Sequence, residues 1–421
     1  MQKKILFLCD ASDIDVVEQS FTNQNNYQLT IETIEKILSF GIKDYLTQTI
    51  ERINHNPEIY DGIVGVHDSS AVFAAIIAQE TGNFFAPVKG VVTSQNKYLC
   101  RRIQKTSTPD CAANYCLALD YLRNPSRLEI PFFIKPVRAN ISFGTHKIDS
   151  PEQLEFYIGH ESMDIARFNQ YYLDALSFNS NYHNALNIAT CNSFLCEEFI
   201  SGNQVTMDGY ICKGEVFFFG ITKAEFYPRT NSFSHHEFPY QFSSKLDVLI
   251  KKNLTILIPA LGIDNSFFNV ELRADEKNET FKVIEVNSRI AFQFAKTIES
   301  VTGVDPLHML CDIAVGRKPE QKVNMDIESE FQFCYNFELH AFADARILHT
   351  PTQIVYDEVA LKYPEVSIRN LIHENAHLSD FKHNPESYRY CIIDVPGNSR
   401  EEIMLKYENV VTMLGYKFDI V

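Results

Sequence analysis

The stretch VIEVNSR, residues 283–289, sets an acid, an amide and a base at two-residue steps in a strand-like run of β-branched residues. Because residues two apart in a strand point to the same side, Glu285 and Asn287 share a face. The segment FFNVEL precedes this stretch across the polar turn RADEKNET, so Glu271 can align with Glu285 across a hairpin. The sequence therefore predicts two carboxylates and an amide oxygen on one face of two paired strands, with Arg289 close by.

Acids inside an otherwise apolar hairpin need a balancing cation, because an unpaired buried carboxylate is strongly destabilising. Oxygen ligands from two acids and one amide suit Mg²⁺, which takes few protein ligands and completes its octahedron with phosphate and water. We therefore expect Glu271, Glu285 and Asn287 to bind Mg²⁺, with Mn²⁺ also possible. The spacing alone equally allows exposed strands whose acids are solvated or paired with Arg273 and Arg289.

The composition is that of a globular protein with several lobes. The chain has 421 residues, 45% of them apolar, and 38 basic against 54 acidic residues give a net charge of −16. Such a charge disfavours a nucleic-acid partner. The sequence has no run of about 18 apolar residues, and its start turns acidic too soon for a signal peptide, so we expect a cytoplasmic protein with no membrane partner. The ten Cys form no CxxC motif and are expected to be free, buried thiols.

The first 90 or so residues predict a parallel α/β unit. The apolar runs at residues 5–9 and 62–66 indicate buried strands. Residues 71–79, which follow the second run, indicate an apolar helix. A helical region interrupted at Pro109 is expected at residues 94–122. This alternation of strand and helix is typical of a parallel sheet.

Two lysines are candidates for binding phosphate. Lys97 lies in a basic helical segment, and Lys135 ends a strand of buried character. The loop after Lys135 contains Ser142 and Gly144, and its backbone N–H groups could close over phosphates. The next strand ends in Glu-Glu-Phe-Ile at residues 197–200, and such a strand edge can read an adenine through one carbonyl and one N–H.

These parts stand in the order found in the ATP-grasp superfamily of carboxylate-amine ligases, which the sequence resembles from the first strand to about residue 320. The motifs are DGIVGVHDSSAVFAAIIAQETG, SQNKYLCRR, FFIKP, CEEFISGNQVTMDGYI, and FFNVEL with VIEVNSR. The resemblance implies an α/β protein with α+β lobes and the ATP-grasp fold, with an N-terminal parallel α/β domain before the ATP-grasp lobes. The implied domains are 1–93 (N-terminal), 94–200 (phosphate-loop lobe), 201–325 (metal-binding lobe) and 326–421 (C-terminal lid of strands and a helix).

The resemblance also implies a role for each matching residue. Main-chain atoms of residues 197–200 would hold adenine, so their side chains would tolerate change. Arg289 would stabilise charge on the transferring phosphoryl group or an acyl-phosphate. The implied sites are Lys97, Lys135, Ser142, Gly144, Glu197, Glu198, Phe199, Ile200 and Gln204 for ATP, Glu271, Glu285 and Asn287 for the metal, and Arg289 and Lys135 for catalysis.

Three features depart from the family pattern. Gln204 stands where many relatives have a Glu on the ribose hydroxyls, and Ala139 and Ile141 stand where glycines are common in the phosphate loop. Residues 290–293, IAFQ, replace a Gly pair after the Asn-Ser-Arg triplet. Their bulk would narrow the acceptor pocket or pack against the C-terminal lobe.

The implied activity is ATP-dependent joining of a small-molecule carboxylate to an amine through an acyl-phosphate, with release of ADP and phosphate. The layout most resembles L-amino acid ligases and carnosine synthase, and a homodimer is possible. Biotin-carboxylase-like activation of bicarbonate and a catalytically silent ATP-binding module are the alternatives. His235 and His236 are expected in a loop that lines the acceptor pocket or lies on the surface, with metal binding conceivable, and Lys223 and Arg229 could hold a substrate carboxylate.

Overall fold

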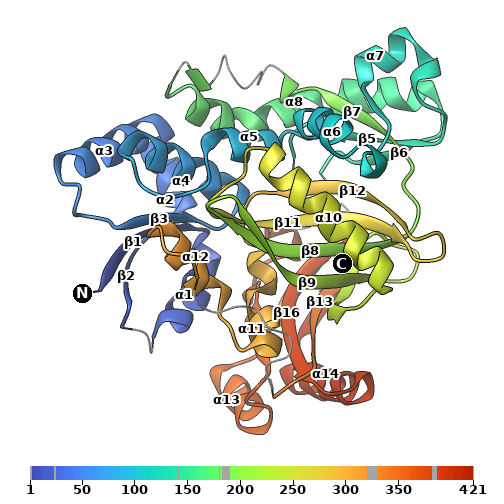
Figure 1. Ribbon diagram of the computed structural model, residues 1–421. Helices are drawn as coiled ribbons and strands as arrows, with labels where there is room; N and C mark the ends of the chain where they lie inside the picture. The colour runs from blue at the N-terminus through green and yellow to red at the C-terminus, as the bar shows by residue number, and fades with distance from the viewer. Residues whose placement is uncertain are drawn as a thin grey trace.

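The computed structural model describes residues 2–22, 25–139, 143–179, 181–182, 190–319, 330–381 and 386–420. Figure 1 shows an N-terminal α/β part in blue beside a large central sheet, with a smaller sheet and long helix above it. The C-terminal part, in orange and red, contributes strands β13 and β16 to this sheet, with helices α13 and α14 below them.

The N-terminal part is a three-stranded parallel sheet with the order β2-β1-β3. Residues 5–9 have no exposed surface, because Leu6 and Leu8 pack with α4 on one face of the sheet, and the side chains at 5, 7 and 9 pack with α1 and α12 on the other. The predicted parallel α/β unit is confirmed. The strands are β1 (Lys3–Cys9), β2 (Tyr27–Thr33) and β3 (Gly62–Gly65), and the helices are α1 (Ile14–Phe21), α2 (Ile34–Phe40), α3 (Ile42–His55), α4 (Asp68–Thr81) and α5 (Val88–Gln95).

An antiparallel sheet of eight strands forms the centre, in the order β12-β11-β8-β9-β10-β13-β16-β15. The buried side of helix α10 (Ser244–Ala260) packs on it through Leu246, Ile250 and Leu254. This sheet runs without a break from the predicted metal-binding lobe into the predicted C-terminal lobe, because β10 pairs with β13. Its strands are β8 (Asn203–Cys212), β9 (Glu215–Phe226), β10 (Phe233–Tyr240), β11 (Ser266–Asp275), β12 (Thr280–Asn287), β13 (Phe333–Ala341), β15 (Ser367–Asn370) and β16 (Tyr388–Gly397).

A smaller antiparallel sheet has the order β4-β7-β5-β6. It places Lys135 and Glu197 on adjacent strands. The predicted helical region at residues 94–122 is wrong in part, since residues 115–117 form a strand that pairs with β7. The elements are α6 (Lys97–Ser107), β4 (Tyr115–Leu117), α7 (Ala118–Arg123), β5 (Phe132–Pro136), β6 (His146–Ile148), α8 (Pro151–Leu176) and β7 (Phe194–Glu198).

The remaining elements are four helices and a separate two-stranded sheet, β14-β17, and α12 packs mainly on β3 of the N-terminal sheet. Helix α11 packs on β13 and β16, and α14 packs on β16. All ten cysteines are free and buried, as predicted. Among the described residues we find no helix with the length and apolar character that crossing a bilayer requires. These elements are α11 (Ala295–Thr302), α12 (Pro306–Ala314), β14 (Ala345–His349), α13 (Gln353–Lys362), α14 (Arg400–Leu414) and β17 (Lys417–Ile420).

Candidate active site

The three predicted metal ligands lie together on β11 and β12. Glu271 and Glu285 are direct cross-strand partners, and Asn269 and Asn287 form the pair two residues further along. Burial, followed by the charge of Glu285, raises the pKa of Glu271 to about 7. Two carboxylates and an amide oxygen are the donor set that fits Mg²⁺, and a cation between the acids would offset this raised pKa.

Lys97 connects the predicted phosphate site to the predicted metal site. It is the first residue of α6, and Asn96 caps this helix by accepting from the Leu99 N–H. The Lys97 Nζ lies 3.0 Å from Glu285 Oε1 and donates to the Ala139 carbonyl at 2.8 Å. Since its side chain is only 9% exposed, this ammonium is directed into the site and is not a solvated surface group.

Glu197 is the centre of a buried ion cluster. Its Oε1 accepts from Arg101 Nε at 2.6 Å, and its Oε2 is paired with Lys135 Nζ. Burial opposes ionisation of Glu197, but the charges of Arg101 and Lys135 outweigh it and lower its pKa. Burial also lowers the pKa of Lys135, against the opposing charge of Glu197. We therefore expect Glu197 to tolerate no change of side chain, contrary to the sequence-based prediction.

The other predicted adenine-contacting residues lie on the opposite side of β7 or beyond its end. Glu198 is paired with Lys282, with 2.9 Å between Oε1 and Nζ. Phe199 is 53% exposed and stacks on Phe133 with ring centroids 5.7 Å apart. A cavity of about 180 Å³ opens here, lined by Glu198, Phe199, Ile200, Ser201, Arg273, Asp275, Thr280, Phe281 and Lys282.

Gln204 lies on β8 beside the predicted metal ligands. Its Nε2 is 3.5 Å from Glu271 Oε2, and its Oε1 accepts from Arg273 at 3.4 Å. The amide therefore links an acid of the metal face to an arginine at the wall of the 180 Å³ cavity. A glutamate at this position would add a third negative charge beside Glu271, whose own ionisation is already disfavoured.

The predicted phosphate loop is described only in part. Ser142 and Ile141 lie outside the described residues, and Ala139 is the last residue described before them. Gly144 has a φ of +67°, and a Cβ there would lie 2.8 Å from Pro136 Cγ. Residue 144 must therefore be glycine, because the backbone is left-handed and a side chain would clash with Pro136. A contact of Gly144 with phosphate stays a prediction.

Arg289 is held by Asp68, a residue that the sequence did not single out as functional. Arg289 Nε donates to Asp68 Oδ1 at 2.9 Å, which joins the end of the β12 segment to the first residue of α4. Burial opposes ionisation of Asp68, but the charge of Arg289 outweighs it and lowers its pKa. Asp68 also lines a second cavity, of about 10 Å³, together with Gln95, Arg138, Ala139, Phe168, Glu285 and Asn287.

Asp208 and Asn269 extend the metal face across β8. Asn269 Nδ2 donates to Asp208 Oδ1 at 2.9 Å, and Asn287 Nδ2 lies 3.4 Å from Asn269 Oδ1. Burial raises the pKa of Asp208 to about 7. Alternation along β8 was the one signal that could have found Asp208, since Thr206 and Asp208 share a face of that strand.

The expectation of a loop around the two histidines was wrong. Both lie on β10, and His236 is 4% exposed, so the surface alternative fails for it. Burial lowers the pKa of His236 to about 4, although Glu338 lies 3.6 Å away, and its Nδ1 has no hydrogen-bond partner in the described chain. His235 stacks against both Tyr335 and Phe337 of the neighbouring strand.

The two basic residues near the histidines lie on or just beyond β9. Lys223 is paired with Glu225 at 2.7 Å and sits over the ring of Tyr240. Arg229 has a left-handed backbone, with a φ of +65°. A contact of either residue with a substrate carboxylate stays a prediction.

A polar group joins η5 (Phe292–Phe294) to β13 and β16. Arg389 NH1 donates to Gln293 Oε1 at 3.0 Å and to Glu338 Oε2 at 2.9 Å. Gln293 in turn donates to Glu338 and Asn336, both at 2.7 Å. Of the two alternatives for residues 290–293, packing against the C-terminal lobe is therefore observed for Gln293.

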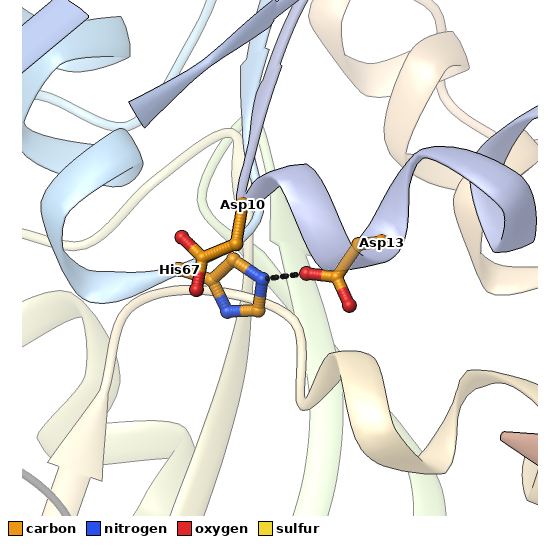
Figure 2. Close-up of side chains that lie close together, drawn as sticks. All are labelled: Asp10, Asp13 and His67. Atoms are coloured by element: carbon orange, nitrogen blue, oxygen red, sulfur yellow. Dashed lines mark hydrogen bonds and ion pairs between the residues drawn. The ribbon is translucent and has the colours of Figure 1, made fainter. Parts of the chain in front are cut away.

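Asp10, Asp13 and His67 form a second cluster, at the carboxyl ends of β1 and β3 (Figure 2). One ligand atom from each lies within 4.8 Å of the others, which is close enough to share a divalent cation. However, Asp13 already bonds to His67 Nε2 at 2.5 Å and pairs with Arg369 at 3.3 Å, and the charge of this arginine opposes a cation. We interpret the cluster as an ion-pair link between the N-terminal sheet and β15.

Comparison with protein families gives a match to the ATP-grasp domain over residues 128–297. No curated protein matches the chain in sequence at a significant level. The matched segment contains Lys135, Glu197, Glu271, Glu285 and Asn287, while Lys97 precedes it.

Solved structures match along nearly the whole chain. An L-amino acid ligase from Bacillus licheniformis has 17% identity and a TM-score of 0.72, with 99% of each chain covered. Phosphoribosylglycinamide synthetase from Anaerococcus prevotii has 13% identity and a TM-score of 0.66, with 100% of each chain covered. The biotin carboxylase domain of Hydrogenobacter thermophilus 2-oxoglutarate carboxylase, in complex with MgADP, ADP and bicarbonate, has 14% identity and a TM-score of 0.68, with coverage of 100% of this chain and 91% of that one. Residues 128–297 therefore match the ATP-grasp domain, and the chain has the ATP-grasp fold, with a parallel three-stranded α/β part before it.

Proposed function

We propose that the protein is an ATP-dependent carboxylate-amine ligase, with an amino acid or a similar small molecule as substrate. The observation that carries this proposal is the 3.0 Å pair between Lys97 Nζ and Glu285 Oε1. It brings a lysine suited to phosphate and an acid suited to Mg²⁺ to the same point. An enzyme that transfers a phosphoryl group needs both kinds of group around the same oxygens.

In the first step, a substrate carboxylate oxygen attacks the γ-phosphorus of ATP, the bond to the bridging oxygen breaks, and ADP leaves. Glu271, Glu285 and Asn287 would hold Mg²⁺, and the bound ion would supply positive charge to the phosphate oxygens. The proposed role of Lys97 and Lys135 is to orient the phosphates, and Arg289, whose guanidinium pairs with Asp68, would act beside them. The proposed role of these cations is to disperse negative charge as it moves during transfer.

In the second step, the nitrogen of an amine attacks the acyl carbon and phosphate leaves, which forms an amide and releases a proton. This path needs no protein nucleophile. Exclusion of water from the site would protect the acyl-phosphate from hydrolysis.

A panel of amino acids, scored for release of ADP and phosphate, tests the proposal. We expect release that depends on both a carboxylate and an amine, and an amide product of the summed mass less water. Release that needs bicarbonate but no amine would favour the biotin-carboxylase-like alternative. Binding of ATP with no release on any panel would identify a silent module.

A further inference from the structure

Arg138 is a buried arginine whose partners are almost all neutral. It is 3% exposed, and its NH1 donates to Asn169 Oδ1 at 2.9 Å. Its NH2 donates to the Tyr171 hydroxyl at 2.7 Å and to Gln95 Oε1 at 3.2 Å. The guanidinium also lies over the ring of Tyr172, 4.0 Å from its centroid. These contacts, most of them from α8, fix the plane of the guanidinium without neutralising its charge.

The charge of Arg138 has no carboxylate within ion-pair distance in the described residues. Burying a charge without a counter-charge is costly, so a buried arginine of this kind indicates an anion that is absent from the protein itself. The other buried cations nearby are all paired with acids. The pairs are Lys97 with Glu285, Lys135 and Arg101 with Glu197, and Arg289 with Asp68.

One N–H of Arg138 is also left without a partner. Its Nε is buried and makes no hydrogen bond within the described chain, while both terminal nitrogens are bonded. A buried donor without an acceptor is uncommon and requires an explanation. Arg138 lines the cavity of about 10 Å³ together with Glu285 and Asn287, and this space has room for about one oxygen-sized group.

We propose that Arg138 is an anion-binding residue that donates its Nε–H to an oxygen of the terminal phosphates of ATP. This inference rests on the proposed function. A carboxylate substrate carries the same kind of oxygen, but the position of Arg138 favours phosphate. Arg138 lies three residues after Lys135, just beyond the end of β5. The next residue, Ala139, accepts a hydrogen bond from Lys97 through its carbonyl, so Arg138 lies close in the chain to contacts of both candidate phosphate-binding lysines.

Nucleotide binding to two variants and one control tests this assignment. Arg138→Met removes the charge, and Arg138→Lys keeps the charge without the Nε–H. Arg167→Met makes the same change at an exposed arginine of α8, which pairs with Asp164, and is the matched control. Calorimetry with MgATP and with adenosine, on the full chain, separates phosphate contacts from the adenine pocket. We expect Arg138→Met to weaken MgATP binding about 10- to 100-fold and adenosine binding less than about twofold.

Arg138→Lys should fall between wild type and Arg138→Met, and Arg167→Met should bind MgATP like wild type. Equal losses for MgATP and adenosine, or no loss for MgATP, would overturn the assignment. If Arg138→Met does not fold, an Arg138→Lys protein that binds MgATP as tightly as wild type overturns it instead. Unchanged MgATP affinity together with a raised KM for the carboxylate substrate would assign Arg138 to that substrate. Wild-type protein that binds no nucleotide would refute the proposed function itself.

Discussion

Glu197 and Glu198 are neighbours in β7, yet Glu197 lies between Arg101 and Lys135 in the interior while Glu198 pairs with Lys282 near the surface. The side chain of Glu197 is 3% exposed, and that of Glu198 is 26% exposed. Alternation along the strand therefore separates a buried charge cluster from a partly solvated ion pair.

Substitution of each by Gln should separate their contributions to stability. Glu197→Gln leaves two buried cations without a counter-charge and should lower the free energy of unfolding by about 3–5 kcal/mol. Glu198→Gln, the matched control, should lower it by less than about 1 kcal/mol, because water screens its pair. Urea unfolding measures both values, and equal losses would contradict the role of the Glu197 cluster.

Glu285→Gln should abolish ATP turnover while the fold persists. The amide keeps the size of the side chain but removes the negative charge that pairs with Lys97 and would bind a divalent cation. We expect a loss of at least about 100-fold in ADP release. Glu299→Gln, which alters a partly exposed acid of α11 that pairs with Lys296, is the control and should retain activity. Turnover by Glu285→Gln close to that of wild type would remove this acid from the site.

Phe199→Ala should weaken the binding of adenosine and of ATP to the same extent. The exposed ring of Phe199 stacks on Phe133 at the wall of the 180 Å³ cavity, where an adenine is expected. Loss of one stacking surface should lower the affinity for both ligands about tenfold, as measured by calorimetry. Phe156→Ala, at an exposed aromatic of α8, is the control. A selective loss for ATP would mean that Phe199 acts on the phosphates and not on the base.

The sequence could predict what depends on neighbours along the chain. A continuous apolar run predicted β1, and two strands joined by a polar turn predicted that Glu271 and Glu285 face each other, as β11 and β12 show. The pair of histidines was assigned to a loop because polar residues interrupt its apolar pattern. The structure buries His236 instead, since β10 lies in the middle of the sheet between β9 and β13.

Contacts between distant parts of the chain could not be predicted. Arg289 and Asp68 are 221 residues apart, and Arg101 and Glu197 are 96 apart. Each pair forms only when the N-terminal part, the small sheet and the central sheet assemble. Local patterns gave the type of each side chain but not its partner, so Asp68 and the side chain of Glu197 were missed.

His236 should make stability depend on pH. Burial lowers its pKa to about 4, so the folded protein keeps it neutral while the unfolded chain binds a proton near pH 6.5. Its contribution is therefore fully present above pH 6.5 and is lost as the pH falls toward 4. Between pH 7.5 and pH 5 the loss should be about 2 kcal/mol in the free energy of unfolding. Urea unfolding of wild type and His236→Gln at both values isolates this term. The variant should lose less stability than wild type by about that amount, and identical losses would show that His236 is protonated in the folded protein or exposed to water.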